Sequence, residues 1–248
     1  MVQGCRNGDS CFFSHDLGPQ VLSSELCVAE GVDAHATALL KLFPTSSDGY
    51  LLLLDDDDLH FSSKFSQHYD PSKIISTTSL SETSMFDPSL SGVNIMWDIQ
   101  NPFRIFTSEV FGSPLPWHKV KCIFWFPNFD ACAENSALQK HLVQNFFEHL
   151  AVRILADTLF DVHVILIMNN IRFAHLQVEK LGRECFFFLT ESFPFDESSF
   201  GELRDVLDTK RPLAASSPIS YVFYLHPPSD LQFGDYATDF HSHLLGNQ

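Results

Sequence analysis

Three potential metal ligands lie close together near the start of the sequence. Cys5, Cys11 and His15 follow the spacing C-x5-C-x3-H and are separated by short segments that contain glycine or serine. Thiolate and imidazole groups suit a tetrahedral zinc ion, which structural sites hold with four ligands. Only three ligands share this spacing, and the fourth could be Cys27, a water molecule or nothing. The sequence therefore predicts a partial zinc site.

Four consecutive aspartates, at 55–58, directly follow the apolar segment 50–54. An apolar run of this kind is typical of a strand buried on both faces of a sheet. In nucleotide-binding α/β folds the ligand lies beyond the carboxyl ends of such strands. The aspartates are interpreted either as a solvated loop or as a Ca²⁺ or Mg²⁺ site, since these cations prefer oxygen ligands.

Other patterns that would indicate catalysis are absent from the sequence. It contains no G-x-x-x-x-G-K-[ST] phosphate loop and no G-x-S-x-G nucleophile elbow, which argues against an ATPase or a serine hydrolase. The histidines show neither the H-x-x-x-H nor the H-E-x-x-H spacing of zinc sites and are interpreted as structural or surface residues. Because these patterns are absent, the sequence predicts no catalytic residue.

An alternation of strands and helices must position these groups. The segment 136–156 carries its apolar residues on one stripe and is the clearest amphipathic helix. Further helices are expected at 32–43 and at 171–181, the second ending before Gly182. Strands are expected at 50–54, 73–77, 93–97, 121–126, 162–168, 185–190 and 221–225. This alternation predicts an α/β fold with a doubly wound, mostly parallel sheet and helices on both faces.

Composition limits the class of protein. With 248 residues, 45% of them hydrophobic, the chain can bury a sizeable core. Its net charge of -16 repels a phosphate backbone, so any RNA contact must be local. No apolar run approaches the ~18 residues of a membrane span. The six cysteines are unevenly spaced and no signal peptide precedes them, which favours a reducing compartment, nuclear or cytoplasmic.

Five segments follow the order of motifs in the eukaryotic ribosomal RNA uridine-N3 methyltransferase-like family. The segment 51–62, LLLLDDDDLHFS, resembles that family's first strand and its G-E-G-(D/N)-F-S-F-S loop. Its T-S-L-D, G-V-x-V-x-x-x-V-D, F-N-F-P-H and H-V-T-L motifs are similar, in that order, to the segments 75–81, 92–98, 123–128 and 163–166. The resemblance implies a seven-stranded, Rossmann-like methyltransferase sheet that ends in a hairpin.

Departures from this family concentrate at the implied AdoMet site. Asp55 and Asp57 stand where the family has glycines, which let the backbone pass close to the cofactor. Ser81 stands where an acid would hold the ribose hydroxyls, and Asp98 ends the third similar segment. The resemblance thus implies degenerate cofactor-binding positions at Asp55, Asp57, Ser81 and Asp98, and AdoMet binding is not expected.

Two more departures lie where the family's target base would enter. Trp125 and Asn128 replace the asparagine and the histidine of the F-N-F-P-H motif. The motifs that form the strands of the fold are retained, whereas the residues of the cofactor site and of the target-base site are not. Loss of methyl transfer is therefore predicted.

The spacing of Cys5, Cys11 and His15 resembles the last three ligands of the CCCH zinc finger, whose aromatic residues commonly stack on single-stranded RNA. The family's first cysteine would fall before Met1. A finger joined to a degenerate methyltransferase-like domain resembles the C-terminal region of plant-type DEAH-box RNA helicases that carry a CCCH finger. The expected organisation is a truncated finger at 1–20, a lead-in helix and linker at 21–48, the methyltransferase-like domain at 49–225 and a polar tail at 226–248.

The predicted function is that of a non-catalytic accessory module of an RNA-processing protein. RNA would bind weakly through the finger, and a helicase or a ribosome-biogenesis factor is the expected partner. One alternative is an active AdoMet-dependent rRNA uridine methyltransferase. Another is a protein-interaction scaffold that exposes the phenylalanines of 186–188 and 193–195.

Overall fold

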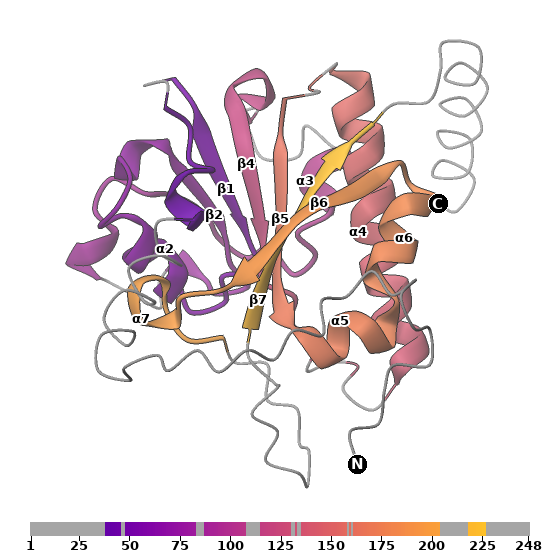
Figure 1. The fold of residues 1–248 in the computed structure, drawn as a ribbon. Helices are drawn as coiled ribbons and strands as arrows, with labels where there is room; N and C mark the ends of the chain where they lie inside the picture. Colours follow the sequence, from indigo (N-terminus) through magenta and orange to yellow (C-terminus); the bar gives the residue numbers. More distant parts are fainter. Residues whose placement is uncertain are drawn as a thin grey trace, which may run out of the picture.

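The computed structural model describes residues 38–45, 48–82, 87–107, 115–129, 132, 135–157, 159, 161–203 and 218–226. These residues form one seven-stranded sheet in the order β3-β2-β1-β4-β5-β7-β6 (Figure 1). Its strands are β1 (Tyr50–Leu54), β2 (Ile74–Thr77), β3 (Asn94–Met96), β4 (Val120–Trp125), β5 (His163–Asn169), β6 (Phe187–Pro194) and β7 (Pro218–Leu225). The order reverses between β1 and β4, as in a doubly wound fold.

The first five strands are parallel, and β7 runs antiparallel to both β5 and β6. The β6–β7 pair is the hairpin-like end of the sheet that the sequence predicts. Leu51–Leu54 of β1 and the six residues of β5 after His163 are wholly buried, because helices and loops cover both faces of these central strands. A mostly parallel sheet in this order is the Rossmann-like, methyltransferase type of fold.

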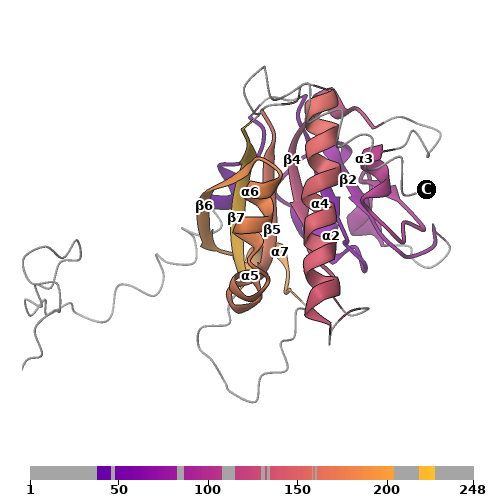
Figure 2. The same ribbon diagram turned by 90° about the vertical axis from the view of Figure 1, so that its right-hand side faces the viewer.

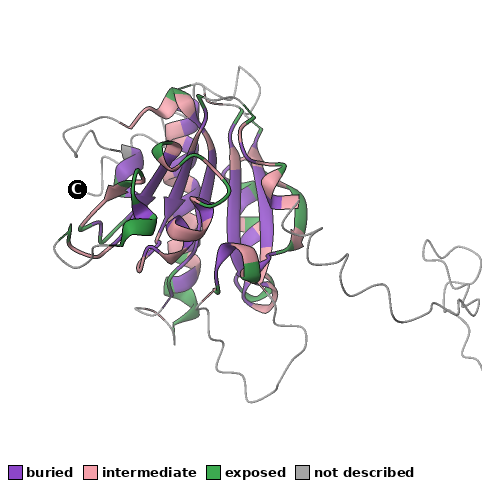
Figure 3. Ribbon diagram, turned by 90° about the vertical axis from the view of Figure 1, so that its left-hand side faces the viewer, coloured by how far each residue is buried: buried purple, intermediate pink, exposed green. Residues whose placement is uncertain are grey.

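Helices pack on both faces of the sheet. On one face lie α3 (Arg104–Thr107), α4 (Ser136–Ala156), α5 (Asn170–Leu176) and α6 (Val178–Glu184), with α4 and α6 in front of the sheet in Figure 2. The core of this face includes Trp125, Phe146, Phe147 and Phe223. The other face packs against α2 (His60–Phe65) and α7 (Glu197–Phe200). Figure 3 shows the strands between these layers as largely buried.

Several predicted elements differ in detail from the structure. The helix expected at 171–181 is two helices, because Gln177 adopts φ 58° and ends α5 before α6 begins. Strand β6 starts two residues later than expected and extends to Pro194. The predicted helix at 136–156 is confirmed. Of the helix expected at 32–43, residues 38–40 are helical and residues 32–37 lie outside the described part.

The exposed phenylalanine patch expected at 186–188 and 193–195 is wrong. Phe187 and Phe195 belong to the cores on the two faces of the sheet, and Phe186 and Phe193 are half-buried. Phe188 is the exposed one, with 41% of its surface accessible. Alternation along β6 turns the rings of Phe187 and Phe188 to opposite faces, whereas Phe186, which precedes β6, packs against the same core as Phe187.

Within the described residues, no helix is long and apolar enough to cross a membrane. The tail predicted at 226–248 lies outside the described residues apart from His226, as does the finger predicted at 1–20.

Candidate functional site

The aspartates follow β1 at the point where the strand order of the sheet reverses. Strand β1 pairs with β2 on one side and with β4 on the other, and all three are parallel. Their carboxyl ends therefore meet at one edge of the sheet, where doubly wound folds bind their ligands. The loop 55–58 faces the segment 126–129 across this switch point.

Asp55 turns its carboxylate toward the end of β4. Its Oδ2 accepts a hydrogen bond of 2.7 Å from the indole Nε1 of Trp125, and its backbone N–H donates to Oγ1 of Thr77 at 3.2 Å. Burial raises the pKa of Asp55 to about 7; the bond from Trp125 opposes this shift, and the nearby Asp57 adds to it. The backbone of Asp55 has φ 60°, a conformation that glycine adopts without strain.

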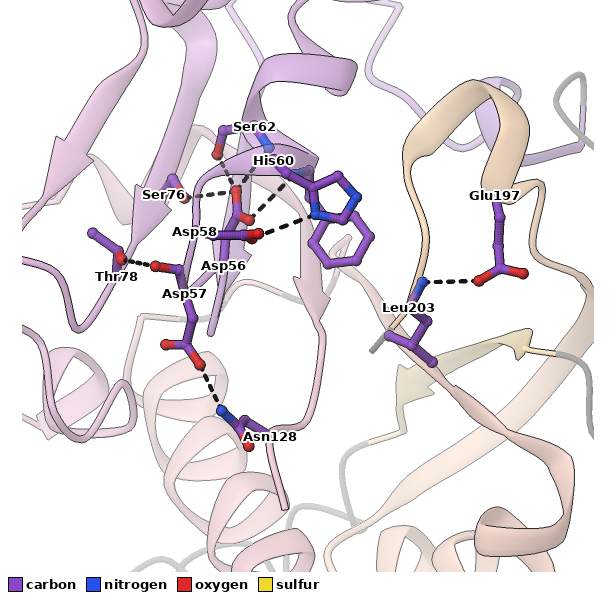
Figure 4. Close-up of polar contacts among 11 residues, drawn as sticks. Asp56, Asp57, Asp58, His60, Ser62, Ser76, Thr78, Asn128, Glu197 and Leu203 are labelled. Atoms are coloured by element: carbon purple, nitrogen blue, oxygen red, sulfur yellow. Dashed lines mark hydrogen bonds and ion pairs between the residues drawn. The ribbon is translucent and has the colours of Figure 1, made fainter. Parts of the chain in front are cut away.

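Asp57 makes a second bridge across the switch point. Its Oδ2 accepts a hydrogen bond of 2.6 Å from Nδ2 of Asn128, which follows β4. Its Oδ1 accepts from Oγ of Ser79 at 3.1 Å, and its backbone carbonyl accepts from Oγ1 of Thr78 at 2.8 Å. The bonds to Asn128 and Thr78 are visible in Figure 4. Asp57 thus joins the ends of β1, β2 and β4.

Asp56 is fully buried and orders the start of α2. Its carboxylate accepts hydrogen bonds from the backbone N–H groups of Phe61 at 3.2 Å and of Ser62 at 2.7 Å, and from the Ser62 hydroxyl. Leu59, the residue before the helix, offers no side-chain cap, so Asp56 satisfies amides that a capping side chain would otherwise bind. Burial raises the pKa of Asp56 to about 6, although the bonds from Ser62 and Phe61 lower it.

The expectation of a solvated acidic loop is therefore wrong, since Asp56 is buried and the other three aspartates are half-buried. The oxygens of Asp56 and Asp58 and a ring nitrogen of His60 lie within 4.8 Å of one another, the one such group among the described residues. Asp58 pairs with Nδ1 of His60 at 3.4 Å. Both carboxylates already have protein partners, which accounts for this cluster without a cation.

Ser81 and Asp98 follow β2 and β3 at the same edge. Ser81 is half-buried, and Asp98 is exposed with φ 60°. The backbone N–H of Asp98 donates to the carbonyl of Leu80 at 2.9 Å, so the segments after β2 and β3 lie side by side. The structure thus gathers the four predicted cofactor positions along the carboxyl ends of β1, β2 and β3. Cys5, Cys11 and His15 lie outside the described residues.

Two proteins are similar to most of this chain. One is the DExH-box ATP-dependent RNA helicase DExH8 of Arabidopsis thaliana, 48% identical over 240 residues that cover 95% of this chain and 24% of the helicase. The other is the zinc finger CCCH domain-containing protein 4 of Oryza sativa subsp. japonica, 39% identical over 274 residues, 98% of this chain and 27% of that protein. The chain thus spans about a quarter of the length of these curated relatives. No protein-family model matches it.

Among solved structures, the chain is similar to a TehB-like SAM-dependent methyltransferase from Corynebacterium glutamicum and to the O-methyltransferase of neocarzinostatin biosynthesis. The first likeness has a TM-score of 0.41 and 11% identity, and covers 77% of this chain and 87% of that one. The second has a TM-score of 0.43 and 9% identity, and covers 79% and 54%. The strand order of the sheet itself identifies the type of fold.

The sequence patterns single out Trp125 and Asn128 but do not identify their partners. Two side chains that pair across 70 positions of the chain produce no pattern in the local spacing of residues. The role of Asp56 could have been found from an acid shortly before the start of a helical segment. A buried group beside the site was also missed: Arg172 stacks on Phe129 at 4.7 Å and donates to Gln139 at 3.1 Å.

Proposed function

We propose that this domain is a non-catalytic accessory module of an RNA-processing protein, in which a methyltransferase-like fold no longer holds AdoMet. One observation carries the proposal. The carboxylates of Asp55 and Asp57 bridge to Trp125 and Asn128, at 2.7 and 2.6 Å, across the switch point between β1 and β4. The protein's own side chains occupy the place where this type of fold would bind a cofactor.

These residues do not fit AdoMet on chemical grounds. The methionine end of the cofactor carries a carboxylate, which needs donors or positive charge, whereas the loop offers carboxylates. Two like charges ~4 Å apart cost on the order of 1 kcal/mol in water and a few times that near a protein surface. Ser81, in place of an acid, removes charge-assisted hydrogen bonds to the ribose worth roughly 1.5 to 3 kcal/mol. Together these terms would weaken a micromolar site by about two orders of magnitude or more.

Calorimetric titration of the chain with AdoMet, and with its demethylated product, tests this proposal. We expect a dissociation constant of about a hundred times a micromolar value or weaker, so that the chain is no more than half-saturated at ligand concentrations up to that value. The double change Asp55→Gly with Asp57→Gly should recover little binding unless Ser81→Asp is added, because the aspartate loop and Ser81 both contribute to the loss of AdoMet binding. A micromolar dissociation constant for the unchanged chain would instead favour the second candidate, an AdoMet-dependent rRNA uridine methyltransferase, which only the type of fold supports.

The RNA-processing context of the proposal comes from the relatives, one named as an RNA helicase and the other as a CCCH zinc finger protein. We propose that Cys5, Cys11 and His15 hold zinc and contribute an RNA contact, with a helicase as the partner. Atomic absorption should find zinc in the chain and lose it in the variant Cys11→Ser, because the thiolate is a direct ligand. Unchanged zinc in Cys27→Ser would exclude Cys27 as the fourth ligand. Zinc that persists in Cys11→Ser would refute the site.

A further inference from the structure

The opposite edge of the sheet, where the parallel strands begin, carries a different set of side chains. Four of the seven lysines in the described part of the chain lie in segments that lead into the sheet there, namely Lys41, Lys73, Lys119 and Lys121. Lys73 directly precedes β2, and Lys119 and Lys121 flank the first residue of β4. The carbonyl of Leu42 accepts a bond from Sγ of Cys122 at 2.9 Å, which places the neighbouring Lys41 beside the start of β4. This edge, at the top of Figure 1, is called the amino edge below.

The pairing register brings two of these lysines to either side of Tyr50. Leu51 pairs with Ile74 and Tyr50 pairs with Val120, so Lys73 and Lys119, the last residues of the turns before β2 and β4, form a row with Tyr50 between them. Two strand spacings make this row about 10 Å wide. Nζ of Lys73 lies 4.9 Å from the centre of the Tyr50 ring. Trp117, next to the exposed His118, is half-buried and has Arg153 over its ring at 5.3 Å. Cations and aromatic rings thus alternate along this edge.

The two edges differ in charge. Six aspartates follow β1, β3 and β6 at the carboxyl edge: Asp55, Asp56, Asp57, Asp58, Asp98 and Asp196. Arg172, which follows β5, is buried there. At the amino edge, Asp48, Asp70 and Asp161 offset part of the lysine charge; Asp161 pairs with Lys121 at 3.3 Å, and Asp157 pairs with Arg153 at 3.0 Å. The carboxyl edge repels a phosphate backbone, whereas the amino edge offers it a local excess of lysine.

We propose that single-stranded RNA contacts this domain at the amino edge, on the row Lys73–Tyr50–Lys119 and the adjoining Trp117, and not at the carboxyl edge. Lysines bind phosphates, and aromatic rings stack on bases without regard to sequence, which is how single strands are held without base readout. The inference rests on the proposed function, because it locates the RNA contact of the accessory module. The contact is weak and salt-dependent, since the whole chain carries a charge of -16.

The test measures fluorescence anisotropy of a labelled 12-nucleotide oligouridylate with the full chain at low salt. The variant Lys73→Glu with Lys119→Glu should bind about tenfold more weakly or worse and show a shallower salt dependence, because two phosphate contacts are lost. The matched control is Lys140→Glu with Lys180→Glu, on α4 and α6, which changes the net charge equally and should weaken binding less than about threefold. Arginine at both positions 73 and 119 should preserve binding. Thermal denaturation of each variant checks that it is folded.

The other possible outcomes of this experiment each contradict the inference. Equal weakening by the edge pair and the control pair would show a general charge effect and overturn the inference. Binding that survives in the edge pair but disappears in Cys11→Ser would assign the RNA contact to the finger alone, so the inference fails while the proposed function stands. No binding by the unchanged chain would overturn this inference and the RNA contact proposed for the finger, but not the loss of AdoMet binding, which the titration tests. Equal competition by poly-glutamate would identify an acidic peptide, not RNA, as the ligand of this edge.

Discussion

At Asp55 a half-buried carboxylate accepts a hydrogen bond from the indole of Trp125, and its burial has a consequence for stability. Burial raises the pKa of Asp55 from 3.8 to about 7. Between about pH 4 and pH 7 the folded state therefore binds more protons than the unfolded state, so the free energy of unfolding falls as the pH rises through this window. Asparagine keeps an oxygen that accepts from Trp125 and carries no charge. We expect Asp55→Asn to raise the free energy of unfolding at pH 8 by about 2 kcal/mol, measured by urea denaturation from pH 4 to 8.

Asp70 offers a control of opposite sign. Its carboxylate is exposed and accepts bonds from the hydroxyl and the N–H of Ser72, which lower its pKa. Asp70→Asn should therefore reduce stability at neutral pH, by an amount that vanishes as the pH falls below the pKa of Asp70. A pH profile of Asp55→Asn that runs parallel to that of the unchanged chain would refute the perturbed pKa of Asp55.

The packing of α7 on α2 depends on a glycine at the end of α7. Gly201 has φ 103°, and a methyl group there would overlap Nε2 of His60, which pairs with Asp58. Gly201→Ala should therefore cost roughly 2 to 4 kcal/mol of stability, from backbone strain and from displacement of His60. In the control Gly92→Ala, φ is also positive, at 93°, but the nearest atom is 3.4 Å away, so only strain remains. Adding His60→Ala to Gly201→Ala should restore part of the loss, whereas purely additive effects in denaturation midpoints would contradict the contact.

Across the whole molecule, the two cores share the central strands and should unfold together. Cys122 belongs to the core on the α2 face and Cys185 to the core on the α4 face, and both are buried free thiols. Burial raises the pKa of both, that of Cys185 to about 12, so neither reacts as a thiolate in the native state. We expect alkylation at both cysteines to appear at the same urea concentration, resolved by peptide mass spectrometry, with the half-buried Cys132 labelled earlier. Labelling of Cys185 well before Cys122 would instead show that the two faces unfold separately.

The amino-acid sequence by itself determined the class of fold and the place of the candidate site. Apolar runs such as 50–54 and 162–168, and the stripe on 136–156, are local patterns, and local patterns set which segments become strands and helices. The position of the aspartates after a buried strand likewise placed them at the carboxyl edge of the sheet. Only the tertiary structure decided that Asp55 meets Trp125, that Asp57 meets Asn128 and that Asp56 is buried under α2. It also turned Phe187 and Phe188 to opposite faces of the sheet. These outcomes depend on which strands become neighbours, because a contact between residues 70 positions apart follows from the order of strands in the sheet and not from the spacing of residues along the chain.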